Sequence, residues 1–310
     1  MNLRFSIIGL IVLAGSALCI GQSERPHLQR TTSETTVSTY ENIGQLWLTH
    51  LPDAPFPHPS RTEGHRYKTN FFSAADHYQD ETVAIFIPKN FQPATKVDFV
   101  VHFHGWYNNV TNVLRHYELP EQMVASEKNA ILIVPQGPRN APDSFGGKLE
   151  DPDGFKRFMT EVMKTLQKQE RFKKCAIGRI ILSGHSGGYQ VISSILSVGG
   201  MTSSIQEVWL FDALYGKTDR FQTWFKNSNG RLINIYTAKG GTKQETENLI
   251  SNLKQEKAPF FSAEEMAITA EELRKHRLNF IFTELSHDEV LNKHKTFLQF
   301  LQASSLDSLR

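Results

Sequence analysis

The sequence has few cysteines, no block of basic residues and no long apolar run beyond its first twenty residues. Only two cysteines occur in 310 residues, Cys19 and Cys175, so a disulfide framework is excluded. Lysine plus arginine (34) and aspartate plus glutamate (32) are interspersed and leave a net charge of +2. Neither nucleic acid nor an anionic membrane surface is therefore indicated as a partner. With 39% hydrophobic and 21% charged residues, the chain has the composition of a globular protein with one large core.

The first residues have the pattern of a targeting segment. Arg4 precedes an uncharged apolar stretch, residues 5–20, that closes with small residues. This pattern predicts a secretory signal peptide over residues 1–21, and hence a secreted or periplasmic protein with no stable membrane span after cleavage. A retained anchor is a weaker alternative because Gly and Ser interrupt the run. A lipoprotein attached at Cys19 is also weaker, since Leu18 stands where such signals usually carry Gly or Ala.

Residues 22–66 are predicted to be a flexible leader followed by an irregular wrap over the surface. Residues 22–39 are rich in Ser, Thr, Glu and Gln and too poor in apolar side chains to offset the entropy of ordering. Residues 40–66 hold four prolines and three histidines without a recurring ligand spacing. The rest of the chain, residues 67–310, is predicted to form a single folded domain.

Strand and helix patterns alternate from residue 82 onward. Apolar runs predict strands at residues 82–88, 97–104, 130–135, 179–183, 208–211, 232–237 and 278–285. Amphipathic or buried helices are predicted at residues 112–126, 153–169, 190–198, 242–253 and 289–302. This alternation predicts an α/β fold: a mostly parallel central sheet with helices on both faces and a site at the carboxyl ends of the strands.

The stretch around Ser186 is the most informative in the chain. The predicted strand 179–183 leads through Gly-His-Ser-Gly-Gly into the predicted helix 190–198. In the Gly-x-Ser-x-Gly pattern, glycines on either side of the serine let strand and helix approach, and the serine stands at the apex of a strained turn. Ser186 is therefore a candidate nucleophile, and the amide of Gly187 lies where negative charge on an acyl oxygen would develop.

Two other strand ends carry candidates for a base and an acid. His287 follows the strand 278–285, and a neutral imidazole can take the proton of a serine hydroxyl that is otherwise too weakly acidic to attack. Asp212 follows the strand 208–211, where a carboxylate could fix the tautomer of His287 and stabilise its imidazolium form.

These features together resemble the α/β-hydrolase superfamily. A strand, Gly-His-Ser-Gly-Gly and a helix are preceded by a strand that ends in His-Gly and followed by an acid and then a histidine, over residues 82–304. The resemblance implies an α/β-hydrolase catalytic domain and a triad of Ser186, Asp212 and His287. Most superfamily members place the acid one strand later, so Glu245 stays open as the alternative to Asp212.

The resemblance also implies an oxyanion hole and an open pocket. The residue after His104-Gly105 is Trp106, whose amide would join that of Gly187 in the hole. Residues 217–230, where many relatives insert a lid, are a short run, so little or no lid is expected. Candidate walls for substrate are Trp106, Tyr107, Tyr189 and Tyr215.

The expected function is that of a serine hydrolase that cleaves a carboxylic ester in a small-molecule or acylated substrate. A peptidase or amidase would use the same residues, and a non-catalytic binding protein on the same fold is the alternative from another class. The pair His102 and His104, together with His185 and His287, offers a competing reading as zinc ligands, but no acidic residue follows at a recognisable spacing. We therefore expect no metal and no cofactor; the sequence gives no indication of the oligomeric state.

Overall fold

The computed structural model of the protein describes residues 35–36 and 40–309. The predicted signal peptide (residues 1–21), Cys19 and nearly all of the predicted leader (residues 22–39) lie outside the described residues. Within the part that is described, no helix has both the length and the apolar character needed to cross a membrane.

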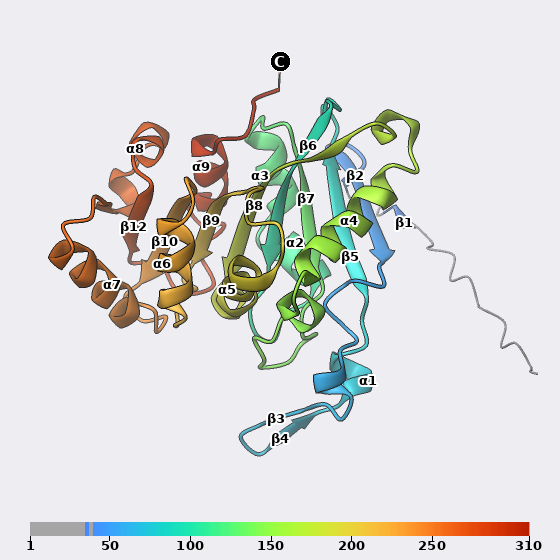
Figure 1. Cartoon of the computed structure of the whole chain (residues 1–310), viewed down its shortest axis with the longest axis horizontal. Coiled ribbons are helices and arrows are strands. Elements are labelled where there is room, and N and C mark those ends of the chain that lie inside the picture. Colours follow the sequence, from blue (N-terminus) through green and yellow to red (C-terminus); the bar gives the residue numbers. More distant parts are fainter. Residues whose placement is uncertain (1–34, 37–39, 310) are drawn as a thin grey trace, which may run out of the picture. The chain divides into compact units, whose positions relative to one another are not determined.

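A ten-stranded sheet organises the described chain (Figure 1). Its order is β1-β2-β5-β7-β6-β8-β9-β10-β12-β11. The strands from β7 to β11 pair in parallel, whereas β1, β2 and β5 are antiparallel to their neighbours. The bounds are β1 Thr35–Thr36, β2 Gly44–His50, β5 Thr82–Pro88, β6 Lys96–Phe103, β7 Ala130–Pro135, β8 Ala176–His185, β9 Ile205–Phe211, β10 Arg231–Thr237, β11 Phe261–Glu264 and β12 Leu278–Thr283. The mostly parallel sheet that the sequence predicts is confirmed.

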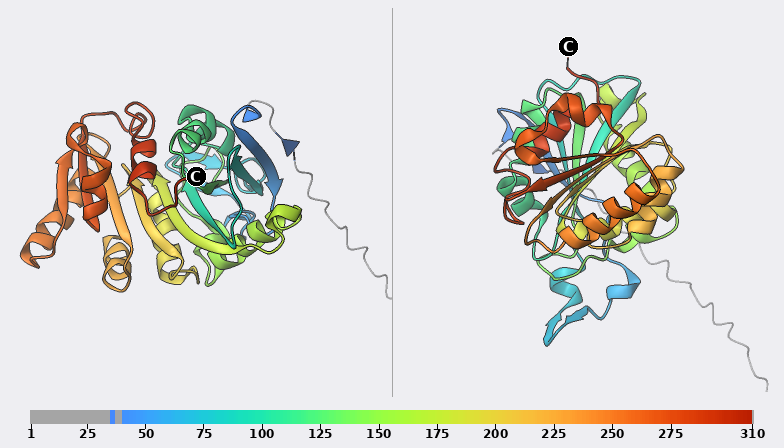
Figure 2. Two further views of the ribbon diagram at one scale, coloured as in Figure 1. Left: turned by 90° about the horizontal axis from the view of Figure 1, so that it is seen from above. Right: turned by 90° about the vertical axis from the view of Figure 1, so that its left-hand side faces the viewer.

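Helices cover both faces of the sheet, as Figure 2 shows. One apolar core lies under α4, α5, α6 and α7, and a second lies under α2, α3, α8 and α9. Neighbouring strand residues alternate between the two cores: Ile180 and Leu182 face the first, and Ile181 faces the second. The helices are α2 Val110–His116, α3 Leu119–Ala125, α4 Gly154–Leu166, α5 Tyr189–Val198, α6 Thr218–Lys226, α7 Lys243–Gln255, α8 Ala270–Lys275 and α9 Thr296–Ala303.

The strand order reverses beside β6, which positions the site. From β6 the chain passes through α2 and α3 to β7 on one side, and then through α4 to β8 on the other side of β6. Because the two crossovers leave on opposite faces, a crevice opens at the carboxyl ends of β6 and β8. These two ends carry Gly105 and Ser186.

The sequence prediction for residues 40–66 needs correction. The segment 40–66 is not irregular throughout, because residues Gly44–His50 form β2 and pair in register with β5. The prolines that suggested irregular chain, at positions 52–59, all follow this strand. Side chains of β2 enter both cores, Leu46 one and Trp47 the other, so this segment belongs to the same folded unit as the rest.

Two predicted helices are interrupted. The run 112–126 divides into α2 and α3 because Glu118 adopts a left-handed conformation (φ 51°) and Pro120 follows without an amide proton. The run 289–302 is helical only from Thr296, since Lys295 is also left-handed (φ 55°) and the residues before it form turns.

A small hairpin was not predicted. It consists of β3 His65–Tyr67 and β4 Asn70–Phe72, and the short helix α1 Ala74–His77 follows it (Figure 1). The ring of Tyr67 lies edge-on to Trp106, with 5.0 Å between centroids. The hairpin therefore reaches the carboxyl edge of the sheet, although residues 217–230 contribute α6 rather than a lid.

Candidate active site

Ser186 lies at a strained turn between a strand and a helix. The strand β8 ends at His185, residues Ser186–Gly188 form one 3₁₀ turn, and α5 begins at Tyr189. The φ angle of Ser186 is 53°, a left-handed value that costs a non-glycine residue about 1–3 kcal/mol. A Cβ at Gly188 would lie 2.6 Å from the carbonyl oxygen of Phe103, so only glycine permits this close approach of turn and neighbouring strand.

His287 and Asp212 meet across the sheet edge. The Nδ1 atom of His287 donates to Oδ2 of Asp212 at 2.6 Å, although the residues are 75 positions apart. Asp212 is fully buried at the end of β9, whereas 30% of the His287 side chain is exposed. Because Nδ1 carries the proton, Nε2 of His287 is the nitrogen that can accept one.

The surroundings of Asp212 keep it ionised. Burial by itself would raise the pKa of Asp212, but hydrogen bonds from His287, Thr242 and the Thr237 amide outweigh burial and lower the pKa. Thr237 Oγ1 also donates to Oδ2 at 3.0 Å. Glu245, the alternative acid, lies in α7 and accepts a hydrogen bond from Thr218 instead of contacting His287.

Ser186 and His287 line one pocket, but their side chains are not hydrogen-bonded in the described structure. The cavity has a volume of about 620 Å³. The hydroxyl of Ser186 interacts with the phenol of Tyr215, which itself donates to the carbonyl of Gly240. Burial and the charge of Asp212 raise the pKa of Tyr215 to about 12. Proton transfer requires the hydroxyl of Ser186 and Nε2 of His287 to come into hydrogen-bond contact, and such contacts often tighten only when substrate binds.

Two backbone amides are available beside Ser186. The amide of Trp106 donates to no acceptor within residues 40–309, whereas the next amide, that of Tyr107, donates to the carbonyl of Ala141 at 3.0 Å. Gly187 lies in the first turn after β8, where amides lack intrahelical acceptors. A Cβ on Gly105 would lie 2.5 Å from Cβ of Ser186, so the two loops are in close contact.

His104 holds the Trp106 loop in place. Its Nδ1 donates to the carbonyl of Gly105 at 2.8 Å, and its Nε2 accepts from the amide of Gly137 at 3.0 Å. Burial lowers the pKa of His104, which keeps the ring neutral and leaves Nε2 as an acceptor. His104 thus links the loop after β6 to the loop after β7.

The predicted wall residues all line the pocket of Ser186. Trp106, Tyr107, Tyr189 and Tyr215 surround it together with the amides and hydroxyls of neighbouring loops. The indole Nε1 of Trp106 donates to Ser144 at 2.8 Å, and Tyr67 packs on the same ring. Neither Ser144 nor the hairpin that carries Tyr67 could be assigned to the site from the sequence, because both come from segments without a motif.

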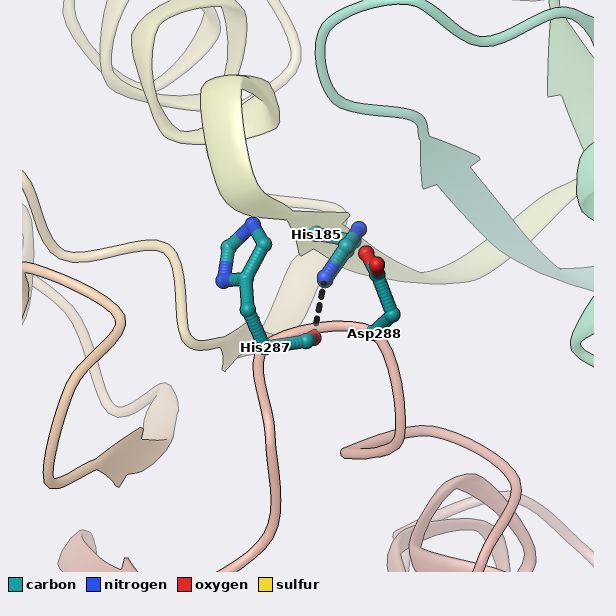
Figure 3. Close-up of side chains that lie close together, drawn as sticks. All are labelled: His185, His287 and Asp288. Carbon is teal, nitrogen blue, oxygen red and sulfur yellow. Dashed lines mark hydrogen bonds between the residues drawn. The ribbon is translucent and has the colours of Figure 1, made fainter.

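His185, which occupies the position before Ser186 in the Gly-x-Ser-x-Gly pattern, makes specific contacts. Its Nε2 donates to the carbonyl of His287 at 2.9 Å, and its Nδ1 accepts from the hydroxyl of Tyr117 at 3.2 Å. Burial lowers the pKa of His185 to about 3, so the ring is neutral near neutral pH. Figure 3 shows His185 between His287 and Asp288.

The same three residues are the one described group whose atoms could hold a metal ion, with ligand atoms of His185, His287 and Asp288 within 4.8 Å of one another. Their hydrogen bonds argue against it, because both nitrogens of His185 and Nδ1 of His287 already have partners. His102 and His104 are not in this group: His102 contacts Ser183 at 2.9 Å. The geometry favours hydrogen bonding over metal ligation.

Comparisons with known proteins identify the fold. No protein-family model and no curated protein sequence matches the chain. A feruloyl esterase module from Clostridium thermocellum aligns with a TM-score of 0.52 at 10% identity, over 85% of this chain and 88% of that one. A fluorophosphonate-binding serine hydrolase of Staphylococcus aureus aligns with a TM-score of 0.50 at 9% identity, over 88% and 99% of the two chains. The protein has the α/β-hydrolase fold.

Proposed function

We propose that this chain, which has the α/β-hydrolase fold, is a serine hydrolase that cleaves a carboxylic ester through an acyl-enzyme on Ser186. The observation that carries the proposal is the left-handed Ser186 in one pocket with His287, whose other nitrogen is bonded to buried Asp212. A strained serine beside an oriented imidazole is the arrangement that acyl transfer requires. The two aligned structures, described as an esterase module and a serine hydrolase, are consistent with this reaction.

In the first half-reaction, Oγ of Ser186 attacks the ester carbonyl carbon and its proton passes to Nε2 of His287. Asp212 stabilises the resulting imidazolium through the 2.6 Å contact with Nδ1. The amides of Trp106 and Gly187 would donate to the oxyanion of the tetrahedral intermediate. Collapse of the intermediate breaks the bond between carbonyl carbon and alcohol oxygen, and His287 returns the proton to the leaving alkoxide.

In the second half-reaction, water takes the place of the alcohol. His287 accepts a proton from the attacking water, and the new tetrahedral intermediate expels Ser186, which recovers its proton from His287. The carboxylic acid leaves, and the free enzyme is restored. Each half-reaction uses the same two amides and the same imidazole.

The reaction would take place outside the cytoplasm. The apolar stretch of residues 5–20 after Arg4 supports cleavage of a signal peptide and a secreted or periplasmic enzyme. Mass spectrometry of the exported chain tests this. A mature N-terminus near residue 22 is expected, and an intact Met1 would contradict export by cleavage.

A fluorophosphonate probe tests the nucleophile. The probe should label the wild-type chain once, on the peptide that contains Ser186, and labelling should be lost in Ser186→Ala. The matched control is Ser183→Ala, three residues earlier in β8, whose buried hydroxyl contacts His102 rather than the pocket. If the wild type is not labelled, the chain is a binding protein on this fold and the proposal is wrong.

A substrate panel separates an esterase from a peptidase. Hydrolysis of p-nitrophenyl acetate and butyrate is compared with that of aminoacyl p-nitroanilides. We expect turnover of the esters and none of the anilides. An amide has a poorer leaving group than an ester, and this group must be protonated as it leaves. Faster turnover of the anilides would establish the peptidase alternative.

A further inference from the structure

The pocket beside Ser186 carries negative charge without a counter-ion. Among residues 40–309, its lining includes the carboxylate of Asp288 but neither lysine nor arginine. A second carboxylate, that of Asp212, lies buried behind His287. By contrast, the buried carboxylate of Glu207 pairs with Arg231 at 2.7 Å. The pocket therefore presents a potential that attracts a cation.

Asp288 is exposed and has no partner of its own. Within the described residues it forms no hydrogen bond and no ion pair, and Figure 3 shows its carboxylate beside the ring of His185. The next residue, Glu289, differs: it accepts hydrogen bonds from Ser286 and contacts Lys293 at 3.3 Å. Of these two neighbouring acids, only Asp288 lines the pocket.

Aromatic rings face the same space. Trp106, Tyr107 and Tyr215 are 39%, 57% and 38% exposed, which makes them three of the six large apolar residues that are exposed in the described chain. Some aromatic rings outside the pocket are covered by the protein's own cations, as Phe225 is by Arg277 at 4.2 Å. In the described residues, no lysine or arginine lies over the three pocket rings.

We propose that the ester bears a positive charge, as a quaternary or protonated amine, on its alcohol part. This inference rests on the proposed function of Ser186. Aromatic faces and a carboxylate together are the groups that bind ammonium ions. His287 returns a proton to the leaving alcohol, so the alcohol lies beside His287, and Asp288 is the next residue along the chain.

An isosteric pair of esters tests the charge alone. Acetylcholine and 3,3-dimethylbutyl acetate have the same shape, but a carbon replaces the charged nitrogen in the second. We expect kcat/KM to be about tenfold higher for acetylcholine, from cation–π contacts and one exposed ion pair. Equal values for the two esters would overturn the proposal and leave the ester hydrolase intact.

Variants locate the source of the preference. In Asp288→Asn the ratio of kcat/KM for acetylcholine to kcat/KM for 3,3-dimethylbutyl acetate should fall about three- to fivefold. Glu289→Gln is the matched control, since it removes a neighbouring carboxylate that does not line the pocket, and it should leave the preference unchanged. If Asp288→Asn and Glu289→Gln behave alike, the charge of Asp288 is not the cause and the proposal is wrong.

Binding without turnover separates this proposal from the proposed function. Calorimetry with choline and with 3,3-dimethylbutan-1-ol requires no reaction, so it reports on the pocket even if Ser186 were inert. Choline should bind the wild type about tenfold more tightly than the neutral alcohol, and Asp288→Asn should reduce the difference. Equal affinities would refute the cation site whatever the outcome with the fluorophosphonate probe.

A separate set of contacts points to His185 as a positioning residue for the same reaction. Its ring lies 4.6 Å from that of His287 at an angle of 33°, and its Nε2 donates to the His287 carbonyl. Tyr117 fixes the tautomer by donating to Nδ1. Because His185 is bonded directly to Ser186 in the chain, it ties the loop of the base to the nucleophile.

Two substitutions at one position test this role, which also rests on the proposed function. His185→Leu removes the donor, and His185→Gln keeps a side-chain NH₂ near the former Nε2. We expect kcat for p-nitrophenyl acetate to fall about tenfold or more in His185→Leu with KM within about twofold, and to recover largely in His185→Gln. A purely structural role would not be rescued in this way.

Three results would overturn the positioning role of His185. Wild-type kcat in folded His185→Leu, or equal losses in both variants, would overturn it. If His185→Leu does not fold by circular dichroism, Tyr117→Phe decides, because it removes only the hydroxyl that orients His185; an unchanged kcat there would also overturn it. Labelling of the wild type by the fluorophosphonate probe first establishes that the reaction itself exists.

Discussion

Among the histidine–carboxylate pairs of the described residues, those of His287 and His294 are alike in geometry. His287 Nδ1 contacts Asp212 at 2.6 Å, and His294 Nδ1 contacts Glu265 at 3.1 Å. Both carboxylates are buried, and the two histidines are 30% and 37% exposed. Judged by pairing, distance and burial alone, either histidine qualifies as an oriented base.

The pairs differ in what surrounds them. His287 lines the pocket of Ser186, and His294 does not. The other partners of Glu265 are Thr283 and Thr296, whose hydroxyls join β12 to α9. The comparison shows that a carboxylate which fixes a histidine tautomer can serve structure alone and does not by itself mark an active site. The reaction depends on what the second nitrogen faces.

Replacing His287 and His294 in turn should distinguish the two histidine–carboxylate pairs most clearly. In His287→Ala, kcat for p-nitrophenyl acetate should fall by at least about 10⁴-fold, because Ser186 then has no base. In His294→Ala, kcat should change by less than about twofold. Steady-state kinetics of both variants, with circular dichroism to establish folding, checks this. Equal losses would mean that His287 has no special role.

Replacing the two carboxylates should affect different quantities: kcat for Asp212 and the free energy of unfolding for Glu265. Asp212→Asn should lower kcat by about 10³- to 10⁴-fold, since the amide no longer fixes the tautomer or stabilises the imidazolium. Glu265→Gln should leave kcat nearly unchanged and lower the free energy of unfolding by about 1–3 kcal/mol, because its two threonine donors and His294 lose a charged acceptor. Urea denaturation and kinetics on the same samples measure both. A stable, inactive Glu265→Gln would contradict the assignment.

The sequence is sufficient to predict the inner strands of the sheet, from β5 to β12 in the sheet order, but not the edge strands β1, β2 and β11 or these surroundings. Strands such as 130–135 are buried on both faces, so an unbroken apolar run identifies them, and β7 has those bounds. The motif around Ser186 is local, so its turn is also predictable. β2 was missed because its alternating pattern is short and followed by prolines. No local pattern could assign a partner to His294, because Glu265, which contacts it, lies 29 positions away in the chain.

Contacts between distant segments mark the limit of prediction for the site. Asp212 could be chosen over Glu245 only as a preference, because the decision depends on which loop folds against His287. The links from His185 to Tyr117 and to the carbonyl of His287 span 68 and 102 positions. Such hydrogen bonds leave no periodic signal, so no pattern in the sequence predicts them.

A second contrast is between the partly exposed histidines that pair with a carboxylate, His287 and His294, and the histidines that are buried. Burial lowers the pKa of His185 from 6.5 to about 3, and it also lowers the pKa values of His102 and His104. The unfolded chain binds protons at His185 below pH 6.5 whereas the folded chain does not until about pH 3. Stability should therefore fall as the pH falls through this window, by about 1.4 kcal/mol per pH unit for His185 alone.

Urea denaturation between pH 6.5 and 4.5 measures this slope. His185→Gln, which cannot titrate, should reduce it by about 1 kcal/mol per pH unit relative to the wild type. Asp212 does not interfere, because its lowered pKa makes its contribution to stability disappear only below its ordinary value of 3.8. An unaltered slope in His185→Gln would mean that the buried ring is protonated in the folded state.

The smallest effect is expected at the hairpin, which supports the pocket from outside. Tyr67 packs edge-on against Trp106 with 5.0 Å between ring centroids, and such a pair is worth about 0.5–1.5 kcal/mol. In Tyr67→Ala the indole keeps its hydrogen bond to Ser144, so kcat/KM should fall only about two- to tenfold. Phe71→Ala, on the same hairpin but 52% exposed, is the control and should behave as wild type. If Tyr67→Ala also matches the wild type, the hairpin does not hold the wall of the pocket, and Trp106 is positioned by the loop after β6 alone.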